Sequence, residues 1–384
     1  MDNYFDVVVI GGGQAGLATG HLLAERGLRF VILEAHDRIG ESWRRRWDTL
    51  RVFTAARYDG LPGMPFPAEP HYFPTKDEVA DYLEAYARAM ALPVRLGVRV
   101  DRLARGDDDR RAFVIHAGED QIVADHVVVA SGAWHEPRIP DIAAELKDDI
   151  LQLHSSKYRD SSQLRPGPVL VVGGGNSGGE IAHSVAGKHE TLLVGRDTGQ
   201  MPFDINGRIA RLADPFIWFM ANHVLTVANP IGRRMRPSQR AHGAPLERVR
   251  KAELAAAGVS RIFARVIGAR DGLPELDDGQ VVNVTNVIWA TGFRHEYPWI
   301  RVERRVVDGD GWPLHERGVS TTTPGLYFVG VPFQYSLASP LIGGVGRDAR
   351  YVVERIVAGS ARFNGQRVGR DHVVHDTDTV EILR

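Results

Sequence analysis

The segment VVVIGGGQAG at residues 7–16 decides the fold, because an apolar, mostly β-branched run leads directly into a G-x-G-x-x-G pattern. A buried strand followed by this pattern is typical of a dinucleotide-binding βαβ unit. Gly11 makes the tight turn, Gly13 lets the backbone approach a pyrophosphate, and Gly16 lets the next helix pack on the strand. That helix then presents unpaired N–H groups to the anion.

The same pattern recurs at residues 169–179, which read VLVVGGGNSGG, with Gly173, Gly175 and Gly178 in the corresponding positions. One isolated copy would be weak evidence. Two copies that both follow apolar strands predict two bound dinucleotides, or one that binds and one that is vestigial. The expected fold class is therefore α/β, with two Rossmann-like dinucleotide-binding domains.

The second domain is expected to be inserted into the first, because the C-terminal segment looks like a return to the first sheet. GLYFVG, which begins at Gly325, is a strand pattern, and the apolar residues from Ala349 to Val357 have helical spacing. The predicted first domain comprises residues 1–160 and 291–384. The predicted second domain covers residues 161–290 and carries a helical insertion at about 200–255.

Composition narrows the function. The chain has 384 residues, a net charge of −1 and no cysteine, which excludes disulfide frameworks, thiolate metal sites and CxxC redox relays. The near-zero charge gives no general attraction to nucleic acid or anionic lipid. The basic stretch at 233–251 is interpreted as a solvated face, with a phosphate patch as the less favoured alternative. No metal site is expected, since His372 and His375 have no partner ligands nearby in the sequence.

Two further observations concern location. The first strand pattern begins by about residue 5, which leaves no room for a signal peptide. The longest apolar run, at 216–228, is interrupted by Asn222 and His223 and is shorter than the roughly 20 residues that a membrane span requires. We therefore expect a cytoplasmic protein without a membrane span.

The two glycine motifs differ at the position that faces the adenosine ribose. Glu34 lies 23 residues after Gly11, and Arg196 lies 23 residues after Gly173. An acidic residue there accepts hydrogen bonds from a free 2′-hydroxyl, whereas an arginine suits a 2′-phosphate. The first site should hold FAD or NAD and the second NADPH, and FAD with NADPH is the economical pair of hydride acceptor and donor. The alternative is that Arg196 is only a solvated surface residue.

The chain resembles the single-component, NADPH-dependent flavin monooxygenases, that is, the flavin-containing and Baeyer–Villiger type enzymes, and especially their short bacterial members. The resemblance covers nearly the whole chain. It rests on motifs that occur in the same order: GGGQAG, ESWRRRWDTLRVFT, YFPTKDEV, HSSKYR at 154–159, GGGNSG and WATGF.

The resemblance implies an FAD-binding first domain and an NADPH-binding second domain. The implied FAD-binding residues are Gly11, Gly13, Gln14, Ala15, Gly16, Glu34, Trp43, Val100, Ser131, Gly132, Leu341 and Ile342. The implied NADPH-binding residues are Gly173, Gly175, Asn176, Ser177, Gly178, Arg196, Thr291 and Gly292. The helix that follows Gly344 and Gly346 is expected to direct its positive end at the flavin.

The activity that the resemblance implies is oxygenation of a soft nitrogen or sulfur atom, or of a ketone, through a C4a-(hydro)peroxyflavin formed with O2. The candidate catalytic residues are His154, Trp43, Asp48 and Tyr158. Only half of the family fingerprint F-x-G-x-x-x-H is present, since Asp148 and Ile150 stand in place of Phe and Gly. Tyr158 stands where Baeyer–Villiger enzymes usually have Trp, which favours oxygenation of a heteroatom. For His154, a hinge or hydrogen-bonding role is favoured over acid–base catalysis.

Several alternatives remain open. A flavoprotein that passes electrons without oxygenating a substrate is the main rival, because half of the fingerprint is missing. A serine hydrolase is a weaker one, because GNSGG at 175–179 also fits the nucleophile elbow G-x-S-x-G. Phe216, Trp218 and Phe219 are predicted to line a path for a small lipophilic substrate, although an ordinary buried helix or the contact of a homodimer would explain them equally well.

Overall fold

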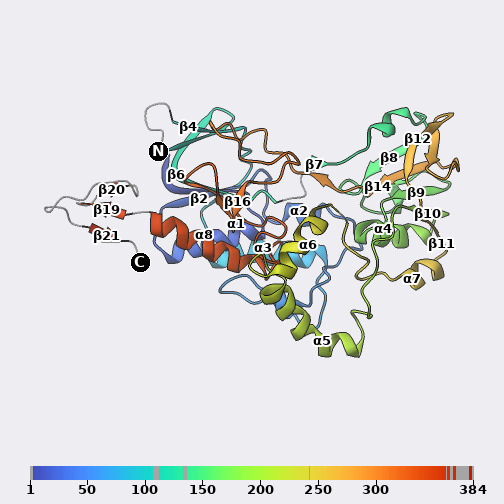
Figure 1. Cartoon of the computed structure of the whole chain (residues 1–384), viewed down its shortest axis with the longest axis horizontal. Coiled ribbons are helices and arrows are strands. Elements are labelled where there is room, and N and C mark those ends of the chain that lie inside the picture. The colour runs from blue at the N-terminus through green and yellow to red at the C-terminus, as the bar shows by residue number, and fades with distance from the viewer. Residues whose placement is uncertain are drawn as a thin grey trace.

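The computed structural model describes residues 3–106, 112–132, 136–241 and 243–359, together with the short strands β19 (Ala361–Phe363), β20 (Gln366–Val368) and β21 (Val380–Ile382). His372 and His375 lie outside the described residues. Figure 1 shows two separate sheet-containing bodies side by side, joined by thin connections near β7 (Glu136–Pro137).

The first sheet has the strand order β16-β17-β18-β6-β1-β2-β3, and β6 also pairs with β5, which pairs with β4. The pairs from β18 to β3 are parallel. The strands are β1 (Tyr4–Ile10), β2 (Phe30–Leu33), β3 (Val94–Arg95), β4 (Arg102–Arg105), β5 (Phe113–Ala117), β6 (Asp120–Val129), β16 (His315–Glu316), β17 (Val319–Ser320) and β18 (Leu326–Phe328).

Alternation along these strands divides the first core into two layers. Val7 and Val9 face α1 (Gln14–Glu25), α3 (Lys76–Ala89) and α8 (Val345–Gly359), which pack together on one side of the sheet. Val8 and Ile10 face the other side, which β4, β5 and the chain around Tyr297 cover. Because both faces are covered at the centre of the sheet, β2 and the carboxyl-terminal halves of β1 and β6 are continuous apolar runs rather than alternating with polar residues.

The second sheet is entirely parallel, in the order β11-β10-β9-β14-β8. Its strands are β8 (Leu151–His154), β9 (Val169–Val172), β10 (Thr191–Val194), β11 (Val259–Ile262) and β14 (Asn286–Trp289). One face packs on α4 (Asn176–Ala186) and α7 (Lys251–Ala256). The other packs on the hairpin of β12 (Val266–Arg270) and β13 (Leu273–Leu276) and on the 3₁₀ turn Asp141–Glu145.

The predicted fold class is confirmed, because strands from both ends of the chain share the first sheet while the second sheet is built from the segment between them. The two connections between the sheets run side by side, since β7 pairs with β15 (Phe293–Arg294) in antiparallel register. Strand β8 ends before residue 161, the predicted start of the second domain, and yet it pairs with β14. A boundary ahead of residue 151 therefore fits the strand pairing better than the predicted one.

The predicted helical insertion contains α5 (Arg208–Phe219), a π-helical turn at Met220–Val224 and α6 (Pro230–Ala241). This segment contacts the first domain: Val227 N–H donates to the Tyr335 carbonyl at 2.7 Å, and Leu337 N–H donates to the Leu225 carbonyl at 3.0 Å. The remaining short helices are α2 (Glu41–Arg44) and the 3₁₀ turns Ala56–Tyr58 and Ser161–Gln163. Among the described residues, no helix is long and apolar enough to cross a bilayer.

Thr75 and Glu78 have the sequence spacing that predicts a capping box, and the N-terminus of α3 carries this box. The Thr75 hydroxyl accepts from Glu78 N–H at 3.2 Å, and the Glu78 carboxylate accepts from Thr75 N–H at 2.8 Å. Two N–H groups that would otherwise lack partners in the first turn are thereby satisfied.

Thr75→Ala should lower the free energy of unfolding by about 1 kcal/mol, because it removes the oxygen that caps α3. A shift of this size lowers the midpoint of thermal unfolding by roughly 2–4 °C. Differential scanning fluorimetry of the two proteins measures it. Thr75→Ser keeps the hydroxyl and should retain the parent midpoint; equal midpoints for Thr75→Ala and the parent would contradict a stabilising cap.

Candidate functional site

The first glycine turn is fixed by close backbone contacts. Gly11 has φ +111°, and a Cβ placed on it would lie 2.5 Å from the Ala130 carbonyl oxygen. A Cβ on Gly16 would lie 1.8 Å from the Gly11 carbonyl oxygen. A Cβ on Gly13, in contrast, has no atom within 4 Å. Gly11 and Gly16 are thus required for packing, whereas Gly13 faces the open space that an approaching pyrophosphate would need.

The second turn repeats this geometry. Gly173 has φ +126° and approaches the Ala290 carbonyl oxygen, which would lie 2.2 Å from an added Cβ. A Cβ on Gly178 would lie 1.8 Å from the Gly173 carbonyl oxygen. Here, however, the space at the turn is narrower, because Asn176 N–H donates to the Ala244 carbonyl at 3.1 Å. The second site is therefore partly covered by the chain's own segment around residue 244.

The Glu34 carboxylate lies directly after β2 and beside the first glycine turn. One oxygen accepts from Gly12 N–H at 2.7 Å. The other accepts from His36 N–H at 2.9 Å and lies 2.7 Å from His36 Nδ1. These contacts fix the carboxylate at the end of the strand, which is where an acceptor for a ribose hydroxyl is needed.

Arg196 lies at the matching position after β10, where its side chain is exposed. The loop under it is fixed by Arg261, which donates to the carbonyls of Gly195 at 2.8 Å and Arg196 at 2.9 Å. The neighbouring acid, Asp197, pairs with Lys251 Nζ at 2.6 Å, a hydrogen bond that lowers the pKa of its carboxyl. Lys251 compensates the negative charge of Asp197, so Asp197 does not oppose the binding of a phosphate at Arg196.

Trp43 connects three segments of the first domain. Its indole Nε1–H donates to the Gln14 side-chain oxygen at 3.4 Å, and Gln14 Nε2 donates to the Pro340 carbonyl at 3.4 Å. The indole on α2 is therefore placed between the start of α1 and the loop that leads into α8. Both of these helix N-termini belong to the region where the sequence predicts FAD.

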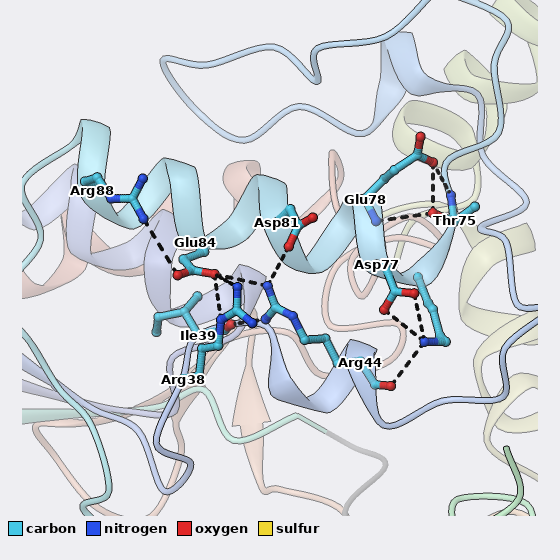
Figure 2. A network of polar contacts seen from close by, with 10 residues as sticks. Arg38, Ile39, Arg44, Thr75, Asp77, Glu78, Asp81, Glu84 and Arg88 are labelled. Carbon is cyan, nitrogen blue, oxygen red and sulfur yellow. Dashed lines mark hydrogen bonds and ion pairs between the residues drawn. The ribbon is translucent and has the colours of Figure 1, made fainter.

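An ionic network holds α2 against α3 and so fixes Trp43 (Figure 2). Arg44 donates to the Ile39 carbonyl at 2.6 Å, to Asp81 at 2.7 Å and to Glu84 at 3.0 Å. Arg38 also pairs with Glu84, and its hydrogen bond lowers the pKa of that carboxyl. The network is needed to position α2, because a helix of only four residues with no buried residue is not held in place by its own packing.

The loop before α8 approaches the chain around Tyr58. A Cβ on Gly343 would lie 1.8 Å from the Tyr58 carbonyl oxygen, so only glycine fits there. The Tyr58 ring stacks on Trp218 of α5, with centroids 4.7 Å apart and planes at 18°. Ile342 is buried in one core layer of the first domain, and Val100 packs half-buried against the other. Leu341 is half-buried. Trp218 thereby lies against the first domain, close to the N-terminus of α8.

The three aromatic residues predicted to line a substrate path separate onto two faces of α5. Phe216 and Phe219 are 65% and 53% exposed, whereas Trp218 points inward onto Tyr58. Helical spacing explains the difference, because residue 218 lies far around the helix from residues 216 and 219. Of the three aromatic residues on α5, Trp218 is therefore the one that faces the protein.

His154 lies at the junction between the domains, and its ring makes three polar contacts. Nδ1 lies 2.9 Å from Ser156 Oγ and accepts from Ser156 N–H at 3.2 Å, which leaves the proton on Nε2 to donate to the Gly292 carbonyl at 3.0 Å. Burial lowers the pKa of the His154 imidazole, which favours the neutral ring. Thr291 closes the same junction, since its hydroxyl donates to the Arg138 carbonyl. This geometry supports the hinge role rather than proton transfer to a substrate.

The other two catalytic candidates differ in their surroundings. Tyr158 is 1% exposed in the core of the second domain, and its hydroxyl lies 3.3 Å from Ser184 Oγ of α4. Asp48 is exposed at the surface, where its carboxylate lies 3.7 Å from Lys76 Nζ. This placement favours a packing role for Tyr158 and gives Asp48 no enclosed site in which to meet a substrate.

The predicted turns that follow β6 and β14 are present. Gly132 and Gly292 both have positive φ, +78° and +82°, and a Cβ on either meets no atom within 4 Å. Ser131 and Gly132 are exposed at the carboxyl end of the first sheet. Such small residues at the carboxyl ends of parallel strands leave room for a ligand beside the strands.

The sequence did not reveal a pair of acidic groups beside the second glycine turn. Glu180 is 6% exposed, and burial raises its pKa to about 7. Burial, together with the charge of Glu180, raises the pKa of Glu247 to about 8. Asn176 connects them, since its amide donates to Glu180 at 3.4 Å and accepts from Glu247 N–H at 3.1 Å. The only available signal was the i, i+4 spacing of Asn176 and Glu180, because Glu247 is distant in sequence.

A second buried carboxyl that the sequence did not reveal is Asp59, close to the stacked rings of Tyr58 and Trp218. It accepts from the Thr54 hydroxyl, and burial raises its pKa to about 7.

Ser177, the nucleophile of the hydrolase alternative, is exposed and is not hydrogen-bonded to a histidine in the described part of the chain. Within the same described ranges, no group of three or more His, Cys, Asp or Glu residues could hold a metal ion.

Comparison with known proteins agrees with this geometry. The family described as "Pyridine nucleotide-disulphide oxidoreductase" matches residues 8–217. The "Uncharacterized oxidoreductase CzcO-like" of Geobacillus kaustophilus is 39% identical, with 93% of this chain and 99% of that protein covered. "Indole-3-pyruvate monooxygenase YUCCA1" of Oryza sativa subsp. japonica is 30% identical, with 84% and 86% covered.

A solved structure of a flavin-containing monooxygenase from Stenotrophomonas maltophilia has a similar fold, with a TM-score of 0.74 at 28% identity, covering 93% of this chain and 99% of that one. The absence of cysteine separates this chain from the disulfide chemistry in the family's name. The chain therefore belongs to the pyridine nucleotide-disulphide oxidoreductase family, and within it to the flavin monooxygenases, which the order of its motifs resembles.

Proposed function

We propose that this protein is an NADPH-dependent FAD monooxygenase that oxygenates a soft nitrogen or sulfur atom of a small lipophilic substrate. The observation that carries the proposal is the pair of glycine turns, equal in backbone geometry but followed by Glu34 in one case and Arg196 in the other. A chain without cysteine that has two such turns needs bound cofactors to accept and pass on a hydride.

FAD fits the first domain. The open space at Gly13 admits the pyrophosphate, and the fixed Glu34 carboxylate accepts from the ribose hydroxyls. The N-terminus of α8 would place its positive end near a bound flavin, an effect of roughly 0.3–1 kcal/mol, or more when buried. Trp43 borders the same region from α2. When bound and reduced, the flavin activates O2 and supplies one oxygen atom to the substrate.

NADPH fits the second domain. Arg196 is exposed after β10 and is free of competition from Asp197, which pairs with Lys251. A guanidinium group can donate two hydrogen bonds to a 2′-phosphate. The hinge residues His154 and Thr291, together with the paired strands β7 and β15, hold the second domain at a defined angle to the first.

The substrate is expected to approach along Trp218 and Tyr58, whose stacked rings lie near the start of α8. Large flat apolar surfaces of this kind suit a lipophilic molecule. Oxygenation of a ketone is the second candidate, and the 30% identity to a plant enzyme named for the keto acid indole-3-pyruvate favours it. Electron transfer without oxygenation is the third, because Asp148 and Ile150 replace half of the fingerprint.

Product analysis separates these candidates. The purified protein is incubated with NADPH, 18O2 and either an alkyl aryl thioether, a tertiary amine or an aromatic keto acid. The proposal expects one labelled oxygen atom in a sulfoxide or an N-oxide. Label found only in the product of the keto acid would replace it with the second candidate. NADPH oxidation with release of hydrogen peroxide and no labelled product would establish the third.

Gly13→Val should yield folded protein that has lost its yellow colour. A Cβ at this position meets no protein atom within 4 Å, so the fold should tolerate the side chain, which would occupy the space that the pyrophosphate needs. Flavin absorbance and circular dichroism measure the two effects. The matched control is Gly268→Val in β12, which also has open space around its Cβ and should keep FAD. Full flavin retention in Gly13→Val would contradict the proposed site.

Arg196→Ala should raise KM for NADPH by about 10- to 150-fold, which corresponds to the roughly 1.5–3 kcal/mol of a charge-assisted hydrogen bond. KM for NADH should change little, and so should kcat, because the contact is remote from the hydride. Steady-state kinetics with both nucleotides provide the test, with exposed Arg294 replaced by Ala as the control. Equal KM values for NADPH and NADH in the parent enzyme would make Arg196 a surface residue only.

A further inference from the structure

The outer face of α5 is apolar and exposed. Ile209, Leu212, Phe216 and Phe219 are 72%, 84%, 65% and 53% exposed. Their spacing of three, four and three residues places them in one stripe along the helix. Four large apolar side chains exposed on a single short helix form a continuous patch of the kind that marks an interaction surface.

The opposite face of α5 packs against the protein, so the usual orientation of an amphipathic helix is reversed. Ala210 is buried, Trp218 stacks on Tyr58, and Asp214 pairs with Arg57 at 3.4 Å. The helix is thus docked through Trp218, Ala210 and Asp214, while its other large apolar side chains on the stripe stay exposed. Figure 1 shows α5 at the edge of the molecule, away from both sheets.

The charge of this region differs from that of the chain as a whole. Residues 205–237 contain five arginines and one acidic residue, Asp214, although the net charge of the chain is −1. Asp214 is turned inward by its pairing with Arg57. Arg208 and Arg211 are exposed on α5, alongside the apolar stripe. The stripe therefore lies in a cationic surface.

We propose that the outer face of α5 binds to an anionic lipid bilayer as an interfacial helix. Ile209, Leu212, Phe216 and Phe219 would enter the boundary between headgroups and acyl chains, while the arginines meet the headgroup phosphates. A second copy of the chain is less well suited to this face, because a two-fold interface pairs the patch with itself. Within residues 205–237 the one acidic residue, Asp214, is turned inward onto Arg57 and offers the exposed arginines no partner. Attachment at this face brings the inward-facing Trp218 close to lipid, a source of lipophilic molecules.

The test is sedimentation of the FAD-loaded protein with vesicles of phosphatidylglycerol, compared with vesicles of phosphatidylcholine alone. We expect binding to the anionic vesicles that weakens at high salt. Ile209→Ser combined with Leu212→Ser should weaken it by about tenfold or more, because each side chain contributes apolar burial. Ile267→Ser, which removes a 58% exposed side chain from β12, is the matched control and should bind like the parent.

The folding of the double variant is checked by its flavin absorbance and by NADPH oxidation without vesicles, and Leu212→Ser alone serves if the double variant has lost FAD. Failure of the parent to bind anionic vesicles, or equal binding by the serine variant, overturns the proposal. So does a parent dimer that the serine substitutions convert to monomer without any vesicle binding, since the face would then join two copies. Binding of the parent to an acidic protein instead of to lipid also overturns it.

Discussion

The contact between the third and first glycines of each turn is the constraint on which the rest of the structure depends. In both domains the helix lies so close to the strand that a single methyl group on Gly16 or Gly178 would overlap a backbone carbonyl oxygen. This approach aligns the N-terminus of each helix with the end of its strand. The positions of Glu34 and Arg196 then follow from the length of the βαβ unit, which is equal in the two domains.

The sequence predicted what depends on local pattern. The glycine turns, the capping box at Thr75 and the return of the C-terminal helix to the first domain all follow from spacing and periodicity. It predicted less well what depends on tertiary contact. The pairing of β8 with β14 joins segments more than a hundred residues apart, so nothing local to residues 151–154 indicates it. For the same reason, periodicity could mark α5 as amphipathic but could not show which face is turned outward.

The same difference between local pattern and tertiary contact decides which residues of the candidate site could be predicted. Glu34 and Arg196 could be found because their role requires a fixed distance from a recognisable motif. The pairing of Glu180 with Glu247 could not, since only folding brings residue 247 to Asn176. Their raised pKa values mean that this part of the second domain takes up and releases protons near neutral pH. A dinucleotide phosphate that approaches Asn176 therefore meets carboxyl groups that can be protonated, rather than two fixed anions.

The pairing of β7 with β15 limits how the two domains can move. Two independent tethers would allow one body to swing and twist freely relative to the other, whereas two tethers that are hydrogen-bonded to each other bend as one ribbon. His154 and Thr291 join this ribbon to the edge of the second sheet. The relative motion of the two nucleotide sites is thereby reduced to few degrees of freedom, so that a hydride donor delivered by one body would meet its acceptor in the other along a reproducible path.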